Sequence, residues 1–284
     1  MYINQFFREK RPVVSFEIFP PKQTSAFDTI ITTTKELAAL KPDFISITYG
    51  AGGSTRSNTL EVAEYIKKEH NIETLAHLTC IANTAADIDT ILDDLQARGI
   101  KNILAMRGDL PQDAPTPTVP VYARNLIEQI KKRNAFCIAA AAYPEGHTEC
   151  TCIEQDIMHL GKKVDAGADI LITQIFFDNA LLYNFQEKIA KQNIQAHLSA
   201  GIMPIFSKSQ IERICSLCGA SIPAKLQQLL DKYGEQPTEL EKAGIEFACE
   251  QIADLCHNNI QGLHIYTMNK PYLAQALVKN TGLR

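Results

Sequence analysis

The sequence lacks a strong excess of charge of either sign. It has 28 Lys and Arg residues against 32 Asp and Glu residues, which gives a formal net charge of −4. A protein that binds nucleic acid through its charge carries a basic surface, so this balance argues against such a binder. No apolar run approaches the roughly 18 residues of a membrane-spanning helix, and residues 1–12 contain no apolar signal-peptide core. We therefore expect a cytoplasmic protein that does not span a membrane.

Cysteine is too sparse to build a disulfide scaffold, with eight residues in 284. Two cysteine pairs still raise the question of a metal site. Cys215 and Cys218 have a CxxC spacing, but no second CxxC or HxxxH follows them. Cys150 and Cys152 lie close to His147 and Glu149, which could suggest a metal cluster, but a Cys-x-Cys spacing is a weak zinc signature by itself. We therefore expect no metal.

Hydrophobic residues make up 45% of the chain and charged residues 21%, which is typical of a folded globular protein. The length allows one large α/β domain or two ordinary domains. No low-complexity linker divides the chain, so we expect one domain over residues 1–284.

Short apolar runs rich in Val, Ile and Phe alternate with segments of helical periodicity. One such segment has Ile88, Leu92 and Leu95 on one face, with a capping-box pattern at Thr84 and Asp87. Most runs start about 30 residues after the previous one, which is the length of one βα unit. They start near Val13, Phe44, Glu73, Asn102, Phe136, Ile170, Gln195 and Gly262.

Eight strands alternating with helices predict an α/β fold of the (β/α)8 TIM-barrel type. A doubly wound open sheet is the alternative, but that fold usually has a GxGxxG turn after its first strand. Here the first strand runs into Phe19, Pro20 and Pro21. The longer gap between strands 7 and 8 predicts extra helices over 207–217, 223–233 and 240–256, which could form part of a binding wall.

Glu17 is the most informative polar residue, because the active sites of such barrels lie where the strands end. Side chains alternate along a strand, so Glu17 and Ser15 share one face while Phe16 and Ile18 share the other. The bulkier apolar face should meet the helices, which places Glu17 inside the barrel. Loss of hydration there favours the neutral acid, the form that a proton donor needs. The alternative is a carboxylate paired with Arg or Lys.

Nearly every other strand also ends in polar residues: Thr48, Tyr49, His77, Arg107, Gly108, Asp109, Tyr143 and Gln174. His77 could be a satisfied core residue, and Arg107 could form an ion pair with Asp109. Gly108 between them would let a planar ligand approach the backbone. Tyr143 and Gln174 could simply cap the core.

The fifth predicted helix carries Asp156, His159 and Lys163 on the side away from its apolar stripe, with Lys162 beside them. This pattern is typical of a solvated face. If the helix borders the barrel mouth, the two lysines could instead hold a phosphate group.

Six motifs taken together resemble the methylenetetrahydrofolate reductase family. In chain order they are SFEIFPPK, ITYGAGGSTR, HLTC, MRGDLP, AAYPEGH and ITQIFFD, and they span most of the chain. The resemblance implies a (β/α)8 barrel that binds FAD, is reduced by NADH or NADPH, and reduces 5,10-methylenetetrahydrofolate to 5-methyltetrahydrofolate. The two substrates would use one flavin in turn.

The resemblance also implies roles for individual residues. Glu17 would protonate N10 of the folate, Asp109 would lie near flavin and pterin and tune the flavin, and Gln174 would bind the pterin. Gln210 and Lys270 match folate-contacting positions, although Lys270 stands where arginine is common. Flavin-contacting positions are matched by Thr48, Tyr49, Ala51, His77, Arg107, Gly108, Asp109, Ala123, Tyr143 and His147, and those near the adenosine and diphosphate by Asp156, His159, Lys162 and Lys163.

Two other functions stay open at this point. The cysteine pairs would suit a zinc-thiolate methyltransferase barrel of one-carbon metabolism, and a barrel could bind folate or flavin without turnover. The family resemblance further predicts small-molecule substrates and a homo-oligomer, favours NADH over NADPH, and, because the sequence ends after the barrel, predicts no inhibition through a C-terminal regulatory domain.

Overall fold

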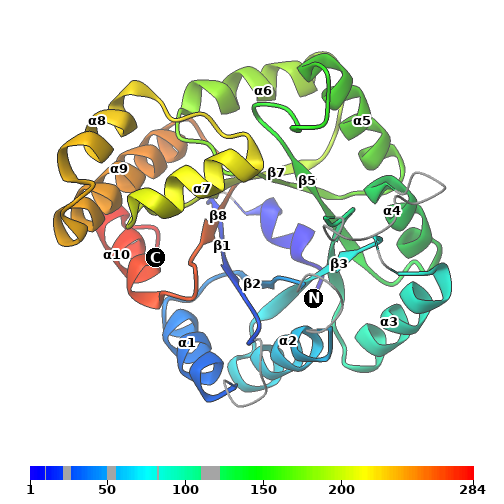
Figure 1. The fold of residues 1–284 in the computed structure, drawn as a ribbon. Coiled ribbons are helices and arrows are strands. Elements are labelled where there is room, and N and C mark those ends of the chain that lie inside the picture. The colour runs from blue at the N-terminus through cyan, green and yellow to red at the C-terminus, as the bar shows by residue number, and fades with distance from the viewer. Residues whose placement is uncertain (10, 22–26, 50–55, 82, 110–121) are drawn as a thin grey trace.

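The computed structural model describes residues 1–9, 11–21, 27–49, 56–81, 83–109 and 122–284. Its eight parallel strands form one closed barrel in chain order (Figure 1). Each strand begins within two residues of its predicted start, which confirms the (β/α)8 prediction. The strands are β1 (Val13–Ile18), β2 (Phe44–Ile47), β3 (Glu73–Thr79), β4 (Asn102–Met106), β5 (Cys137–Ala142), β6 (Ile170–Thr173), β7 (His197–Ile202) and β8 (Gly262–Tyr266).

Helices surround the barrel and cover the outer faces of its strands (Figure 1). The predicted capping box is present, since the Asp87 N–H donates to Thr84 Oγ1 over 3.2 Å and the Thr84 N–H donates to Asp87 Oδ2 over 2.9 Å. The helices between strands are α1 (Phe27–Ala39), α2 (Arg56–His70), α3 (Ala85–Ala97), α4 (Ala123–Lys132), α5 (Ile153–Asp165) and α6 (Asn179–Lys191), and α10 (Pro271–Thr281) follows β8.

The two faces of each strand differ as alternation predicts. On β1, Phe16 and Ile18 belong to the large apolar core between strands and helices, whereas Val13 belongs to a smaller core inside the barrel. A short 3₁₀ helix, η1 (Ile3–Arg8), packs against this inner core near the amino ends of the strands. The Ile3 N–H donates to Asn102 Oδ1 over 2.9 Å. The sequence analysis did not predict η1.

Three further helices lie between β7 and β8, as predicted: α7 (Lys208–Cys218), α8 (Ala224–Tyr233) and α9 (Pro237–His257). They have an apolar core of their own, which includes Ile205, Ile211 and Leu226. A Cβ atom on Gly244 would lie 2.0 Å from the Ile205 carbonyl oxygen, so α9 approaches the segment after β7 closely enough to require glycine there. No helix in the described part of the chain is long and apolar enough to cross a membrane.

Candidate active site at the carboxyl ends of the strands

A cavity of about 810 Å³ opens where β3, β4, β5 and β6 end. Its volume is within the range of ligand pockets. The cavity also borders the start of α4 and one face of α5. Of the residues that the sequence analysis selected, its wall contains Tyr49, Arg107, Gly108, Asp109, Ala123, Tyr143, His147, Asp156, His159, Lys162, Lys163 and Gln174.

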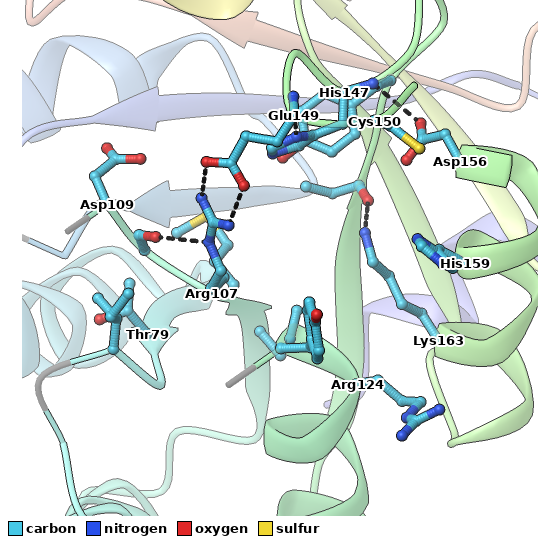
Figure 2. A pocket seen from close by; sticks show the side chains of 18 of the residues that line it. Thr79, Arg107, Asp109, Arg124, His147, Glu149, Cys150, Asp156, His159 and Lys163 are labelled. Atoms are coloured by element: carbon cyan, nitrogen blue, oxygen red, sulfur yellow. Dashed lines mark hydrogen bonds and ion pairs between the residues drawn. The ribbon is translucent and has the colours of Figure 1, made fainter. Parts of the chain in front are cut away.

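Arg107 forms a two-point ion pair with Glu149 from the β5–α5 loop (Figure 2). One of its bonds joins Arg107 Nη2 to Glu149 Oε1 over 2.7 Å. This hydrogen bond raises the pKa of Arg107 and lowers the pKa of Glu149. The expected alternative of an Arg107–Asp109 ion pair is therefore wrong. The Asp109 side chain is exposed on the cavity wall.

Gly108 has a φ of +84°, in the left-handed region that favours glycine. A Cβ atom there would also lie 2.8 Å from Ile81 Cγ2 and 2.9 Å from Thr79 Cβ. Backbone conformation and packing against the end of β3 therefore explain this glycine without reference to a ligand.

The β5–α5 loop is fixed to the start of α5 beside the cavity. The His147 backbone N–H donates to Asp156 Oδ2 over 3.3 Å (Figure 2). The His147 ring packs edge-on against Tyr143, with 4.7 Å between ring centroids. Burial raises the pKa of Tyr143 to about 12, so its hydroxyl stays protonated at neutral pH. Tyr143 thus presents a neutral hydroxyl group on an apolar ring.

Lys163 lies on the face of α5 that meets the cavity. Its Nζ donates to the Ala141 carbonyl oxygen over 3.0 Å and lies 5.6 Å from the centroid of the Tyr143 ring. Burial lowers the pKa of Lys163. Figure 2 shows His159 and Asp156 on the same side of α5. The predicted polar face of this helix therefore borders the cavity.

Glu17 lies inside the barrel, where alternation along β1 predicted it, and is 8% exposed. Its Oε2 lies 3.3 Å from His264 Nε2 and 3.4 Å from His77 Nε2. Burial lowers the pKa of His77 to about 4, so this ring is neutral near neutral pH. Within the described ranges no Lys or Arg forms an ion pair with Glu17, whose titratable partners there are the two histidines.

Glu17, His77 and three other predicted site residues that the structure describes are not part of the wall of this cavity. Thr48 donates its backbone N–H to the Ile18 carbonyl oxygen over 3.0 Å. Gln210 is in the first turn of α7, and Lys270 Nζ lies 4.5 Å from the centroid of the Phe206 ring. Ala51 lies outside the described residues.

Several polar residues at the site were missed by the sequence analysis. Glu149 was considered only as a metal ligand, and Ser15, Ser46 and His264 were given no role. His264 could have been found, because alternation along β8 places it and Tyr266 on the inward face. Glu149 had no such signal, because it pairs with a residue 42 positions away.

Among the residues that the structure describes, no group of three or more His, Cys, Asp or Glu side chains is arranged to hold a metal ion. Burial raises the pKa of Cys215 to about 11.

A closed (β/α)8 barrel with a polar cavity at the carboxyl ends of its strands is the architecture of TIM-barrel enzymes. Residues 2–282 match the family model for methylenetetrahydrofolate reductase. The chain belongs to this family, as the motifs indicated, and the family's reaction is the reduction of methylenetetrahydrofolate.

Individual relatives agree with this assignment. The chain is 33% identical over 271 residues to 5,10-methylenetetrahydrofolate reductase of Escherichia coli K12, covering 95% of this chain and 91% of the relative. It is 32% identical over 271 residues to the enzyme of the same name from Pectobacterium carotovorum, covering 95% and 90%. It is also 34% identical over 284 residues to methylenetetrahydrofolate reductase (NADH) 1 of Arabidopsis thaliana, covering 95% of this chain and 48% of the relative.

The fold is also similar to a solved structure, that of an uncharacterized protein from Clostridium thermocellum that binds two copies of 5-methyl-5,6,7,8-tetrahydrofolic acid. The TM-score is 0.65 with 15% sequence identity, over 98% of this chain and 96% of that chain. This similarity supports the barrel fold.

Proposed function

We propose that this protein reduces 5,10-methylenetetrahydrofolate to 5-methyltetrahydrofolate with FAD as cofactor and NADH as reductant. The observation that carries the proposal is the single cavity whose wall brings together most of the positions that match flavin-contacting residues of the family. Plant relatives named as NADH enzymes support NADH over NADPH, and a structural neighbour that binds a methylated folate supports the product class.

The residues of the cavity fit a flavin dinucleotide. Tyr49 lines the wall, and its hydroxyl is buried without a hydrogen-bond partner among the described residues, so a ligand could pair with it. Lys162 and Lys163 supply positive charge for a diphosphate, and the first turn of α4 supplies the favourable end of a helix dipole. When bound, the flavin would accept a hydride from NADH and transfer it to the folate.

The chain's own residues would then hold the folate and supply a proton. Glu17 would donate a proton to N10 of the folate, so that the five-membered ring opens to a 5-iminium cation that can accept the hydride. Asp109, a carboxylate on the cavity wall, would stabilise the positive charge that develops. Gln174, also on the wall, would bind the pterin, while Gln210 and Lys270 would meet the rest of the folate.

One spectroscopic experiment tests both half-reactions. The visible absorption of the purified protein is recorded before and after anaerobic addition of NADH, and again after 5,10-methylenetetrahydrofolate. We expect an oxidised-flavin band that NADH bleaches and the folate restores. A colourless protein that cannot be reconstituted with FAD would contradict the proposal and favour the zinc-thiolate methyltransferase or the non-catalytic binding barrel. A homo-oligomeric state and a cytoplasmic location stay predictions.

A further inference from the structure

A chain of buried polar side chains connects Glu17 to the interior of the barrel. Ser15 Oγ lies 2.7 Å from His264 Nδ1, and His264 Nε2 lies 3.3 Å from Glu17 Oε2. Ser15 and His264 are both fully buried. Ser15 is the first residue of the motif SFEIFPPK, whereas His264 lies outside the six motifs.

Strands β1 and β8 fix the relative positions of Ser15, His264 and Glu17. Ser15 and Glu17 share the inward face of β1, and Ser15 is the register partner of His264 on β8. The His264 ring is held between two aromatic rings, with centroids 6.4 Å from Phe44 and 5.2 Å from Tyr266. The imidazole therefore has little freedom to turn away from the carboxyl group.

A neutral imidazole has one N–H donor and one acceptor nitrogen, so its partners decide which nitrogen carries the proton. When Glu17 is protonated, its O–H can donate to His264 Nε2, and His264 Nδ1–H can donate to Ser15 Oγ. The Ser15 hydroxyl then donates to the Leu263 carbonyl oxygen, which lies 3.3 Å away. Glu17 Oε2, both ring nitrogens of His264 and Ser15 Oγ are then all paired.

When Glu17 is ionised, the same atoms can pair in the opposite direction. The Ser15 hydroxyl turns to donate to His264 Nδ1, and His264 Nε2–H donates to the Glu17 carboxylate. The second arrangement has one proton fewer, the one that Glu17 gives up, and the remaining ring proton of His264 is on Nε2 instead of Nδ1. A buried polar group left unpaired costs about 1–3 kcal/mol, and neither arrangement leaves one.

The other titratable groups that face Glu17 are uncharged near neutral pH. His77 on β3 is buried and neutral, and its Nε2 also lies 2.6 Å from Ser46 Oγ. Tyr266 on β8 donates its hydroxyl to the Thr173 carbonyl oxygen over 2.8 Å, and burial raises its pKa well above the ordinary value. Among the described residues, no Lys or Arg side chain forms an ion pair with Glu17.

We propose that Ser15 and His264 are positioning residues that keep Glu17 paired in both of its protonation states, so that it can give a proton to the substrate and regain one from solvent. This inference rests on the proposed function, because it assigns partners to the proposed proton donor. Neither residue needs to touch the substrate or the flavin.

The test compares two substitutions of His264. Glutamine keeps an amide that can accept from a carboxylic acid or donate to a carboxylate, whereas leucine of similar size can do neither. We expect His264→Leu to slow folate reduction about tenfold or more and to displace its pH profile. We expect His264→Gln to restore most of the rate and the parent profile. Flavin content and flavin reduction by NADH should be unchanged in both.

The matched control is His197, whose ring stacks on Phe7 at the opposite end of the barrel with centroids 4.8 Å apart. We expect His197→Leu and His197→Gln to keep the parent folate rate and pH profile. If His264→Leu does not fold, Ser15→Ala replaces it, and we expect a displaced pH profile from that smaller change.

The inference would be overturned if His264→Leu, or Ser15→Ala used in its place, kept the folate-reduction rate and the pH profile of the parent protein. So would an equal loss in His264→Leu and His264→Gln without a change of pH profile, because that result indicates a structural role only. Normal folate reduction in Glu17→Gln would instead overturn the proposed proton donor itself. An inactive Glu17→Gln beside an unchanged His264→Leu would overturn only the role of Ser15 and His264.

Discussion

The two ends of the barrel interior are built from the same strands but from different chemistry. At the amino ends, Val13, Phe44 and Leu75 are fully buried and pack against η1. Toward the carboxyl ends, several inward positions are polar and include Glu17 and His77. The fold thus assigns stability to one end and chemistry to the other, which is the usual division in TIM barrels.

This division arises within single strands. On β1 the successive inward residues are Val13, Ser15 and Glu17, and on β3 they include Leu75 and His77. A substitution only two residues further along the same face should therefore change a different property of the protein.

The largest expected effect is at the amino end. Leu75→Ala should reduce the free energy of unfolding by about 2–5 kcal/mol, because it leaves a cavity in the inner core. Denaturant unfolding measures this change, and the folded fraction should still bind flavin. The control is Leu217→Ala, at a position that is 71% exposed, which should change stability by less than about 0.5 kcal/mol. Loss of flavin affinity without loss of stability in Leu75→Ala would contradict the division.

The second effect concerns pH, because burial lowers the pKa of His77 from 6.5 to about 4. Above pH 6.5 neither the folded nor the unfolded protein protonates this ring. Between pH 6.5 and 4 the unfolded chain gains a proton that the folded protein does not, so stability falls on acidification, by about 3 kcal/mol over the window. Unfolding titrations of the parent and His77→Gln at several pH values measure this, and equal pH slopes would count against it.

A smaller effect is expected at Lys163, a partly buried lysine on the cavity wall. Lys163→Met should weaken FAD binding about 10- to 100-fold, because a charge-assisted contact to the diphosphate is lost. Calorimetric titration of the apoprotein with FAD measures the affinity. Lys188→Met is the matched control, since Lys188 pairs with Glu154 outside the cavity wall. Similar affinities in the two variants would remove Lys163 from the site.

The smallest effect is expected at Glu149, which is 61% exposed in its ion pair with Arg107. Glu149→Gln should change the free energy of unfolding by less than about 1 kcal/mol, because solvent screens exposed ion pairs. Glu154→Gln, which removes an exposed ion pair with Lys188, should behave alike. A loss in Glu149→Gln as large as that in Leu75→Ala would show that the carboxyl end also determines stability.

The parts of the fold with local signals were predictable. Strand starts and the Thr84 capping box depend on residues close in sequence, and the structure has both. The helix η1 was missed because its six residues are held by contacts with distant strands, such as the bond from Ile3 to Asn102. Local periodicity carries no information about such docking.

The candidate site shows the same limit. Alternation on β1 correctly placed Glu17 inside the barrel, and the same rule applied to β8 would have found His264. One alternative paired Arg107 with its near neighbour Asp109, but the actual partner comes from the next βα unit. Pairings between units depend on how the loops fold over the barrel, which one sequence does not reveal.

The central claim is that Glu17 donates the proton for folate reduction. The most direct test is a stopped-flow comparison of the two half-reactions in the parent and Glu17→Gln. We predict that flavin reduction by NADH is unchanged, because that step needs no proton from Glu17, and that reoxidation by 5,10-methylenetetrahydrofolate falls about 10²-fold or more. Reoxidation at the parent rate would contradict the account.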